Sequence, residues 1–241
     1  MSNIIILVIA SRGDIYDKFI TEYWIPMIKY AKNNYINIHI FLIFGQDTNI
    51  NDFTEIKDNI IIAPYSETYR NILEKTLYTF DYCLQKYKFN FLFRTNLSSF
   101  ILLDKLNILV NNLLDIDYIG GFIGTYNLDK KDKKNNFKFI CGAGILFSKD
   151  IVQNLVSNRH KIKNEVVDDV DIGKYLYTNK FYYNNLPRYD LYKYKELLTP
   201  KQLEICLKTI LDNNHYHVRI KNYNRLCDIQ IISFLVNHFY K

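Results

Sequence analysis

The sequence predicts an α/β fold in which a mixed, mostly parallel sheet is flanked by helices. The first observation is an apolar run, Ile4 to Ala10, that ends in the small polar turn Ser11 to Asp14 before a helical pattern. This order is the first half of a βαβ unit, and a run rich in β-branched residues is typical of a buried parallel strand. The second observation is size: 241 residues, 49% of them hydrophobic, suit one domain with a sizeable core. We therefore expect residues 1–241 to form a single domain.

The first half of the chain continues this alternation of helices and strands. The predicted elements are a helix over residues 16–33, a strand from Ile38 to Phe44, a short strand from Asp58 to Ala63 and a helix from Tyr69 to Lys86. The last helix places six residues at helical spacing on its inner face: Ile72, Leu73, Thr76, Leu77, Phe80 and Leu84. Lys75 on this helix is either a functional residue or a solvated lysine. Tyr69 is either a functional residue or a core aromatic.

A stretch in the middle of the chain is where we expect a site to form. An apolar strand, Phe89 to Phe93, delivers the polar cluster Arg94 to Ser99 to the edge of the sheet. In open α/β sheets, ligands bind just beyond the carboxyl ends of the strands. Arg94, Asn96 and Ser98 are therefore candidate binding residues for a nucleotide sugar. The alternative is that Asn96 and Ser98 only cap the next helix.

The second half of the chain carries further small and polar clusters among its predicted elements. These elements are a helix from Asp104 to Leu114, a strand from Tyr118 to Gly124, a polar loop from Thr125 to Asn136, a strand from Phe137 to Ile140 that leads into Cys141 to Gly144, a helix from Lys149 to Ser157 capped by Ser148, a short strand from Phe181 to Leu186 and a closing amphipathic helix from Asp228 to Phe239. Gly142 and Gly144 let a ligand or a backbone come close. Asp168 and Asp169 open a helix, where carboxylates are favoured by the helix dipole alone, or they are catalytic.

One strand near the end of the chain carries several potential cations. The segment from His215 to Lys221 alternates in polarity, which puts four side chains on one side of a strand: His215, His217, Arg219 and Lys221. Such a row suits an anion such as a diphosphate.

Charge, cysteine pattern and missing motifs exclude several classes of function. The net charge of +6 could favour nucleic acid, but the basic cluster Lys130 to Lys134 is interrupted by Asp132, and a solvated loop explains it better. The four cysteines form no CxxC pair, which is typical of free thiols in a reducing compartment. The sequence has no GxGxxG fingerprint and no P-loop, which disfavours a dinucleotide or ATPase site. The first strand is too short to span a bilayer, so we expect a cytoplasmic protein without a transmembrane segment.

Four segments resemble those of β-1,3-glycosyltransferases of the galactosyltransferase and Fringe type, in the same order and across about two-thirds of the chain. Tyr69 to Thr76 resembles the family's Y-x-N-L-T-x-K-T helix, and Phe91 to Ser98 stands where the family has a strand followed by K-x-D-D-D. Cys141 to Ser148 is similar to S-G-x-G-Y-V-L-S, and Val167 to Gly173 to E-D-V-x-x-G. The resemblance implies a GT-A fold, which is Rossmann-like, and transfer of a sugar from a nucleoside-diphosphate donor with inversion.

The resemblance also implies roles for individual residues. Asp169 matches the family's catalytic aspartate, with Asp168 as its neighbour, and an inverting transferase needs such a carboxylate to take the acceptor's proton. Gly142 and Gly144 would shape the donor-sugar and acceptor pocket. Donor binding is expected at Ser11 and Arg12, where such folds hold the nucleoside, and at Arg70, Lys75, Arg94, Asn96, Ser98, His217, Arg219 and Lys221. The donor is expected to be a UDP-sugar, and the acceptor a hydroxyl of a glycan, a protein or a small molecule.

The chain departs from the family at the metal motif. Asn96 and Ser98 replace carboxylates that would bridge a divalent cation, Mn²⁺ or Mg²⁺, to the diphosphate, and neither is a good ligand for a hard cation without a carboxylate nearby. Under one hypothesis Arg94, Arg219 and Lys221 neutralise the diphosphate and tight metal binding is not required. Under the other, the chain is a non-catalytic relative that binds a nucleotide sugar or a glycan. His217 is also a candidate lone metal ligand, a phosphate contact or a packed histidine.

Overall fold

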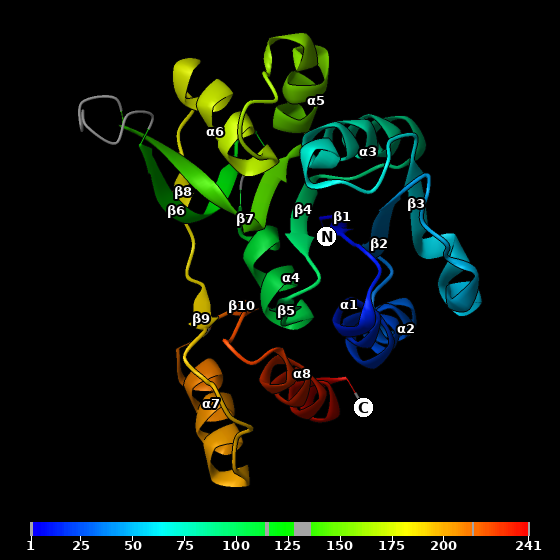
Figure 1. The fold of residues 1–241 in the computed structure, drawn as a ribbon. Coiled ribbons are helices and arrows are strands. Elements are labelled where there is room, and N and C mark those ends of the chain that lie inside the picture. The colour runs from blue at the N-terminus through cyan, green and yellow to red at the C-terminus, as the bar shows by residue number, and fades with distance from the viewer. Residues whose placement is uncertain (1, 114–115, 128–135, 214, 241) are drawn as a thin grey trace.

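A computed structural model describes residues 2–113, 116–127, 136–213 and 215–240 of the chain. Its main sheet has seven strands in the order β3-β2-β1-β4-β7-β6-β8 (Figure 1). The strands are β1 (Ile4–Ile9), β2 (Ile38–Gly45), β3 (Ile60–Ala63), β4 (Phe91–Asn96), β6 (Ile119–Asn127), β7 (Asn136–Ser148) and β8 (Asn184–Asn185). Every neighbouring pair is parallel except the two made by β7, so the predicted mixed, mostly parallel sheet is confirmed.

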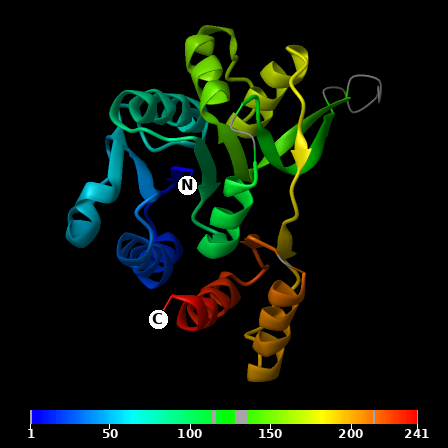
Figure 2. The ribbon, with the colours of Figure 1, turned by 180° about the vertical axis from the view of Figure 1, so that it is seen from behind.

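Helices cover both faces of this sheet. One face packs against α1 (Asp14–Phe19), a π-helical turn η1 (Ile20–Trp24), α2 (Ile25–Asn34), α4 (Leu103–Asn111) and α8 (Arg225–Phe239), and the other against α3 (Ile72–Lys86), α5 (Lys149–Ser157) and α6 (Asp168–Thr178). The helix α7 (Pro200–Asp212) lies away from this sheet and contacts α8 (Figure 1). The view from behind shows the same separation, with α5 and α6 at one end and α7 and α8 at the other (Figure 2). Side chains of β1 alternate between the two cores, which explains its uninterrupted apolar sequence.

A second, smaller sheet lies beside the carboxyl end of β4. It contains β5 (Ser99–Ile101), β10 (His217–Ile220) and β9 (Tyr189–Leu191), with β10 between the other two. Short 3₁₀ segments, η2 (Asn51–Asn59), η3 (Tyr69–Asn71) and η5 (Arg159–Lys161), complete the described elements.

Several sequence predictions need correction in this region. β4 continues to Asn96, which pairs with Ile9, so Arg94 to Asn96 lie within a strand and not in a turn after it. Asn96 and Ser98 do not cap a helix, because β5 follows them and α4 begins only at Leu103.

Corrections also apply to the rest of the second half. β7 is one strand of 13 residues, and it includes Gly142 and Gly144. Of the predicted loop over residues 125–136, the ends belong to β6 and β7, and residues 128–135 lie outside the described part of the chain. Ser148 occupies the N-cap position of α5 without a capping side-chain bond. α8 contacts α1, η1, α7 and β10, so it is buried on more than one face and is not a simple amphipathic helix.

The π-helical turn anchors the connection between the two sheets. Trp24 Nε1 donates a hydrogen bond to Leu97 O at 3.1 Å, and Ile101 N donates to Tyr23 Oη at 2.8 Å. Both aromatic side chains are fully buried. Two consecutive residues of the first helical segment therefore hold the two ends of the segment that carries Ser98.

Candidate active site

A buried ion pair joins the ends of two predicted site segments. Arg94 Nη2 lies 2.5 Å from Asp168 Oδ2, and Thr76 Oγ1 donates to the same oxygen at 3.1 Å. Arg94 Nη1 also donates to the carbonyl oxygen of Gly142. Arg94 and Asp168 are only 5% and 2% exposed, so removal of either partner would leave an uncompensated charge in the interior. The pair places the start of α6 against β4 and β7.

Asp169 lies next to this pair with its carboxylate held in one orientation. Its Oδ2 accepts a hydrogen bond from Gly142 N at 2.6 Å and its Oδ1 accepts one from Val170 N at 2.9 Å. Burial and the neighbouring charge of Asp168 raise the pKa of Asp169 above its ordinary value, against the opposing effects of Arg94 and the two N–H groups. A half-buried carboxylate with a raised pKa is a stronger base than a solvated one, which suits removal of a hydroxyl proton.

The two glycines of β7 make room for the side chains of the site. A Cβ at Gly142 would lie 2.9 Å from Asp169 Oδ2 and 3.0 Å from Arg94 Nη1. A Cβ at Gly144 would lie 2.4 Å from His217 Cε1 and 2.8 Å from Phe93 Cζ. Side chains of the site itself lie against these two glycines. A role of Gly142 and Gly144 in a sugar pocket stays a prediction.

We expect Gly144→Ala to lower the free energy of unfolding by about 1–3 kcal/mol, because the added methyl group meets two side chains that have no space to move away. His217 and Phe93 are 1% and 0% exposed. Denaturant unfolding measures the change. Gly124→Ala is the comparison: its Cβ would meet Cys141 Sγ at 2.9 Å in a half-exposed part of β6, so the loss should be smaller. Equal stability of Gly144→Ala and the wild type would contradict this packing.

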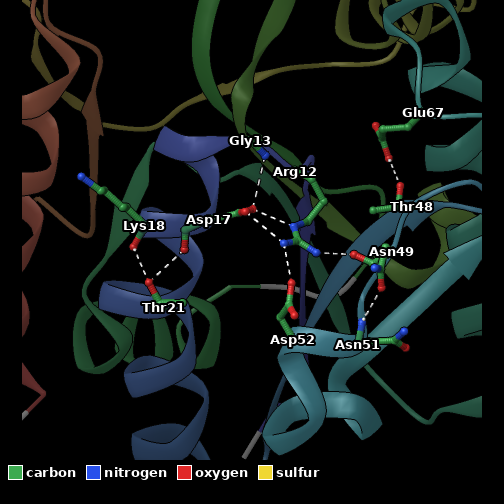
Figure 3. A network of polar contacts seen from close by, with 10 residues as sticks. All are labelled: Arg12, Gly13, Asp17, Lys18, Thr21, Thr48, Asn49, Asn51, Asp52 and Glu67. Carbon is green, nitrogen blue, oxygen red and sulfur yellow. Dashed lines mark hydrogen bonds and ion pairs between the residues drawn. The ribbon is translucent and has the colours of Figure 1, made fainter.

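The predicted nucleoside end contains Arg12 in a network of acidic partners (Figure 3). Arg12 forms ion pairs with Asp17 at 2.8 Å and with Asp52 at 2.8 Å, and it also donates to Asn49 O. Its guanidinium lies 4.6 Å from the centre of the Phe53 ring. A cavity of about 360 Å³ borders this network; its lining residues are Arg12, Asp47, Thr48, Asn49, Asp52 and Glu67. Arg12 lies beyond the carboxyl end of β1, as expected. Its charge, however, is already balanced by the two aspartates.

Glu67 organises the same end of the sheet, and the sequence analysis did not identify it. Its carboxylate accepts hydrogen bonds from Gly45 N at 2.7 Å and from Ser11 Oγ at 3.4 Å, and it forms an ion pair with Lys75. Lys75 is 0% exposed, so the alternative of a solvated lysine is wrong. Since the ammonium group is enclosed with Glu67, Lys75 can influence a ligand only through that carboxylate.

The residues at the family's metal positions bond to each other. Asn96 Oδ1 accepts hydrogen bonds from Ser98 Oγ at 3.0 Å and from Ser99 Oγ at 3.3 Å. Within the described ranges, no three His, Cys, Asp or Glu side chains gather in a group that could hold a metal ion. The donors present therefore do not form the carboxylate set that a hard cation prefers. That tight metal binding is not required stays a hypothesis.

The predicted row of cations on β10 is only partly cationic. His217 is buried against the edge of Phe93, and burial together with Arg188, Arg219 and His215 lowers the pKa of His217 well below its ordinary value. Burial and Lys105 lower the pKa of His215, which stacks on Tyr189. Both imidazoles are therefore neutral near pH 7, and the cations are Arg219 and Lys221, which line a cavity of about 100 Å³.

Arg70 and Tyr69 are both exposed, and a third residue, Arg188, was not part of the sequence prediction. Arg70 is exposed, and its carbonyl oxygen accepts a hydrogen bond from Asn164. Tyr69 is not a core aromatic, because it is 68% exposed. Partial burial and the charges of Asp169 and Asp168 raise the pKa of its phenol, so the ring lies within electrostatic reach of the aspartates. Arg188 was not identified from the sequence, because only the pairing of β9 with β10 brings it to the site.

The topology of the main sheet, with Asp169 beside the buried Arg94–Asp168 pair, is that of a GT-A-like α/β fold. No family model matches the chain. It is similar to human UDP-GalNAc:beta-1,3-N-acetylgalactosaminyltransferase 2, with 29% identity over 146 residues, which are 56% of this chain and 29% of that protein. The same enzyme of Xenopus tropicalis is 26% identical over 149 residues, 57% of this chain and 30% of the relative. These similarities confirm the resemblance to β-1,3-glycosyltransferases, although the chain spans less than a third of the length of these relatives.

A solved structure confirms the fold over nearly the whole chain. It is a glycosyltransferase involved in the glycosylation of the major capsid of PBCV-1, with a TM-score of 0.55, 8% identity, and coverage of 96% of this chain and 98% of that one. Separately, no helix among the described residues is long and apolar enough to cross a bilayer.

Proposed function

We propose that the chain transfers a sugar from a UDP-sugar to a hydroxyl acceptor with inversion at the anomeric carbon. The observation that supports this most strongly is the Asp169 carboxylate, oriented by Gly142 N and Val170 N beside the Arg94–Asp168 ion pair. The acceptor oxygen attacks the anomeric carbon from the face opposite the diphosphate while its proton passes to Asp169. The bond to the diphosphate oxygen breaks, and that oxygen keeps the electron pair. UDP and a glycosylated acceptor are the products.

The donor and the setting of the reaction are also proposals. The relatives are named for a UDP-GalNAc donor and a β-1,3 linkage, which supports a UDP-sugar donor for this chain. The acceptor class is a glycan, a protein or a small molecule with a free hydroxyl. The cysteines are all free thiols, which suits the reducing cytoplasm as its location.

One specific feature favours a second candidate, a non-catalytic relative that binds a nucleotide sugar or glycan. Asn96 and Ser98 stand where a metal-dependent transferase carries carboxylates, and they bond to each other. A relative without turnover would retain donor binding and release no UDP when an acceptor is added.

A thermal-shift series of nucleotide sugars, each with Mn²⁺ and with EDTA, tests the proposal. A ligand present at 100 times its Kd raises the melting temperature by about 5–10 °C for a chain of this size, because it binds only the folded state. We expect a UDP-sugar to produce this shift and EDTA to leave it in place. The absence of a shift with every UDP-sugar would contradict the proposal, and abolition of the shift by EDTA would show that a metal is required. UDP release on addition of acceptor then separates the enzyme from the binding protein.

A further inference from the structure

The arginine and lysine residues first assigned to the donor are largely occupied by acidic partners. The terminal nitrogens of Arg94 bond to Asp168 and to Gly142 O, and only its Nε is without a partner among the described residues, so a role for Arg94 at the diphosphate stays a hypothesis. Lys75 is paired with Glu67 and Arg12 with two aspartates. A diphosphate still requires positively charged donors with free N–H groups at the place where it leaves.

Arg188 offers such a donor in a fixed orientation. Its side chain is 3% exposed, and Asp190 holds it in a fork through Nε at 2.6 Å and Nη2 at 2.9 Å. Its guanidinium lies 4.3 Å from the centre of the Phe122 ring. Nη1 is buried and has no hydrogen-bond partner among the described residues. A buried N–H group without an acceptor is costly, and a phosphate oxygen would satisfy it.

Arg219 lies on the neighbouring strand with a second free donor. It is paired in register with Asp190, the residue that holds Arg188, and its Nε is buried without a hydrogen-bond partner in the described part of the chain. Arg219 also lines the 100 Å³ cavity with Lys221, so its charge faces a space that a ligand could enter.

Contacts with β6 and β7 place the two arginines near Asp169. Arg188 lies over the ring of Phe122 in β6, and Arg219 follows His217, which contacts Gly144 of β7. Both arginines lower the pKa of the Cys141 thiol, Arg188 also through a hydrogen bond, while burial and Asp169 raise it. Cys141 precedes Gly142, whose N–H donates to Asp169. Cys141 and Gly142 therefore connect the candidate base to the two guanidinium groups.

We propose that Arg188 and Arg219 together bind the diphosphate of the donor and stabilise it as it departs. This inference rests on the proposed function. Asp190 offsets part of the charge of Arg188 but leaves Nη1 directed by the fork. Lys221, which is exposed at the mouth of the small cavity, adds a further charge. The two arginines would then neutralise the diphosphate directly, in place of a divalent cation held by acidic side chains.

Calorimetric titration of UDP in the presence of EDTA tests the arginine pair. Arg188→Gln and Arg219→Gln should each weaken UDP binding about tenfold or more, the effect of one lost charge-assisted hydrogen bond. Uridine, which has no phosphate, should bind as to the wild type when followed by ligand-observed NMR. Arg159→Gln is the control, because the Arg159 side chain is 64% exposed and its ion pair with Asp81 is long, at 3.9 Å. If Arg188→Gln does not fold, the UDP affinities of Arg219→Gln and Arg188→Lys test the inference instead. Arg188→Lys keeps the charge but loses the forked pairing with Asp190.

The outcomes separate the two proposals. A wild-type chain that does not bind UDP would overturn the proposed function and the arginine pair with it. A wild-type chain that binds UDP, with unchanged affinity in Arg219→Gln and in the Arg188 variants, would overturn only the arginine pair. A loss of UDP and uridine binding together would show that the arginines support the pocket structurally, which also contradicts the inference.

Discussion

Asp169→Asn is expected to lower the rate of sugar transfer by about 10²- to 10⁴-fold, the usual contribution of a general base. The amide oxygen can still accept the hydrogen bond from Gly142 N, and only the local bond from Val170 N is lost, so the fold and the donor affinity should remain close to those of the wild type. Steady-state kinetics give the rate, and calorimetric titration of UDP gives the affinity. Asp171→Asn is the matched control, because Asp171 lies in the same helical turn but its carboxylate accepts bonds from the backbone of Glu165 and Val166.

The same prediction has a pH dependence with a defined sign. Asp169 acts as a base only when ionised, and its pKa is raised, so the ionised fraction falls at a higher pH than for an ordinary aspartate. The wild-type rate should therefore decrease on the acidic side with an apparent pKa above the usual carboxyl value of about 3.9. The acid limb should disappear in Asp169→Asn. An acid limb that is identical in this variant would assign the titration to another group.

Arg94→Met is expected to lower the free energy of unfolding by about 3–5 kcal/mol, because it leaves the buried Asp168 carboxylate without its cation. For a chain of this length this corresponds to a fall in melting temperature of about 6–20 °C. Urea unfolding measures the loss, and Arg159→Met controls for removal of an exposed arginine.

A double variant gives this prediction a second, sharper test. Arg94→Met with Asp168→Leu removes both charges and should recover much of the lost stability, since apolar side chains of similar volume can replace a buried pair. If Arg94→Met were no more costly than Arg159→Met, the ion pair would not be an important support of the site.

Strands and long helices were predictable where the signal is local. The apolar runs of β1, β2 and β4 and the helical spacing of α3 and α5 are written in consecutive residues, and their bounds agree with the structure to within a few residues. α7 was missed although its signal is local as well: Thr199 and Gln202 form a capping box in front of the helix. β5, β9 and β10 are each only three or four residues long, which is too short for a pattern to identify their pairing.

The sequence predicted several residues of the candidate site, but not the ion pairs that these residues form. The four resembling segments identified Arg94, Asp168 and Asp169, and the structure brings these three residues together. The partner of Arg94 lies 74 positions further along the chain, and no local pattern encodes which cation a buried carboxylate will meet. The same reason explains Lys75, whose burial depends on Glu67 in an irregular segment, and Arg188, whose position depends on the register of β9.

The π-helical turn at Ile20–Trp24 links the first helical segment to the connection between β4 and β5. A π turn contains one residue more than an α-helical turn would, and this allows the neighbouring side chains of Tyr23 and Trp24 to grip both ends of one connection. Loss of a single residue there would rotate α1 by roughly 100° relative to α2, since an α-helix has 3.6 residues per turn. Length in this helix is therefore constrained as tightly as chemistry is at the aspartates: an indel far from them in sequence would release the peptide that presents Ser98 to the donor.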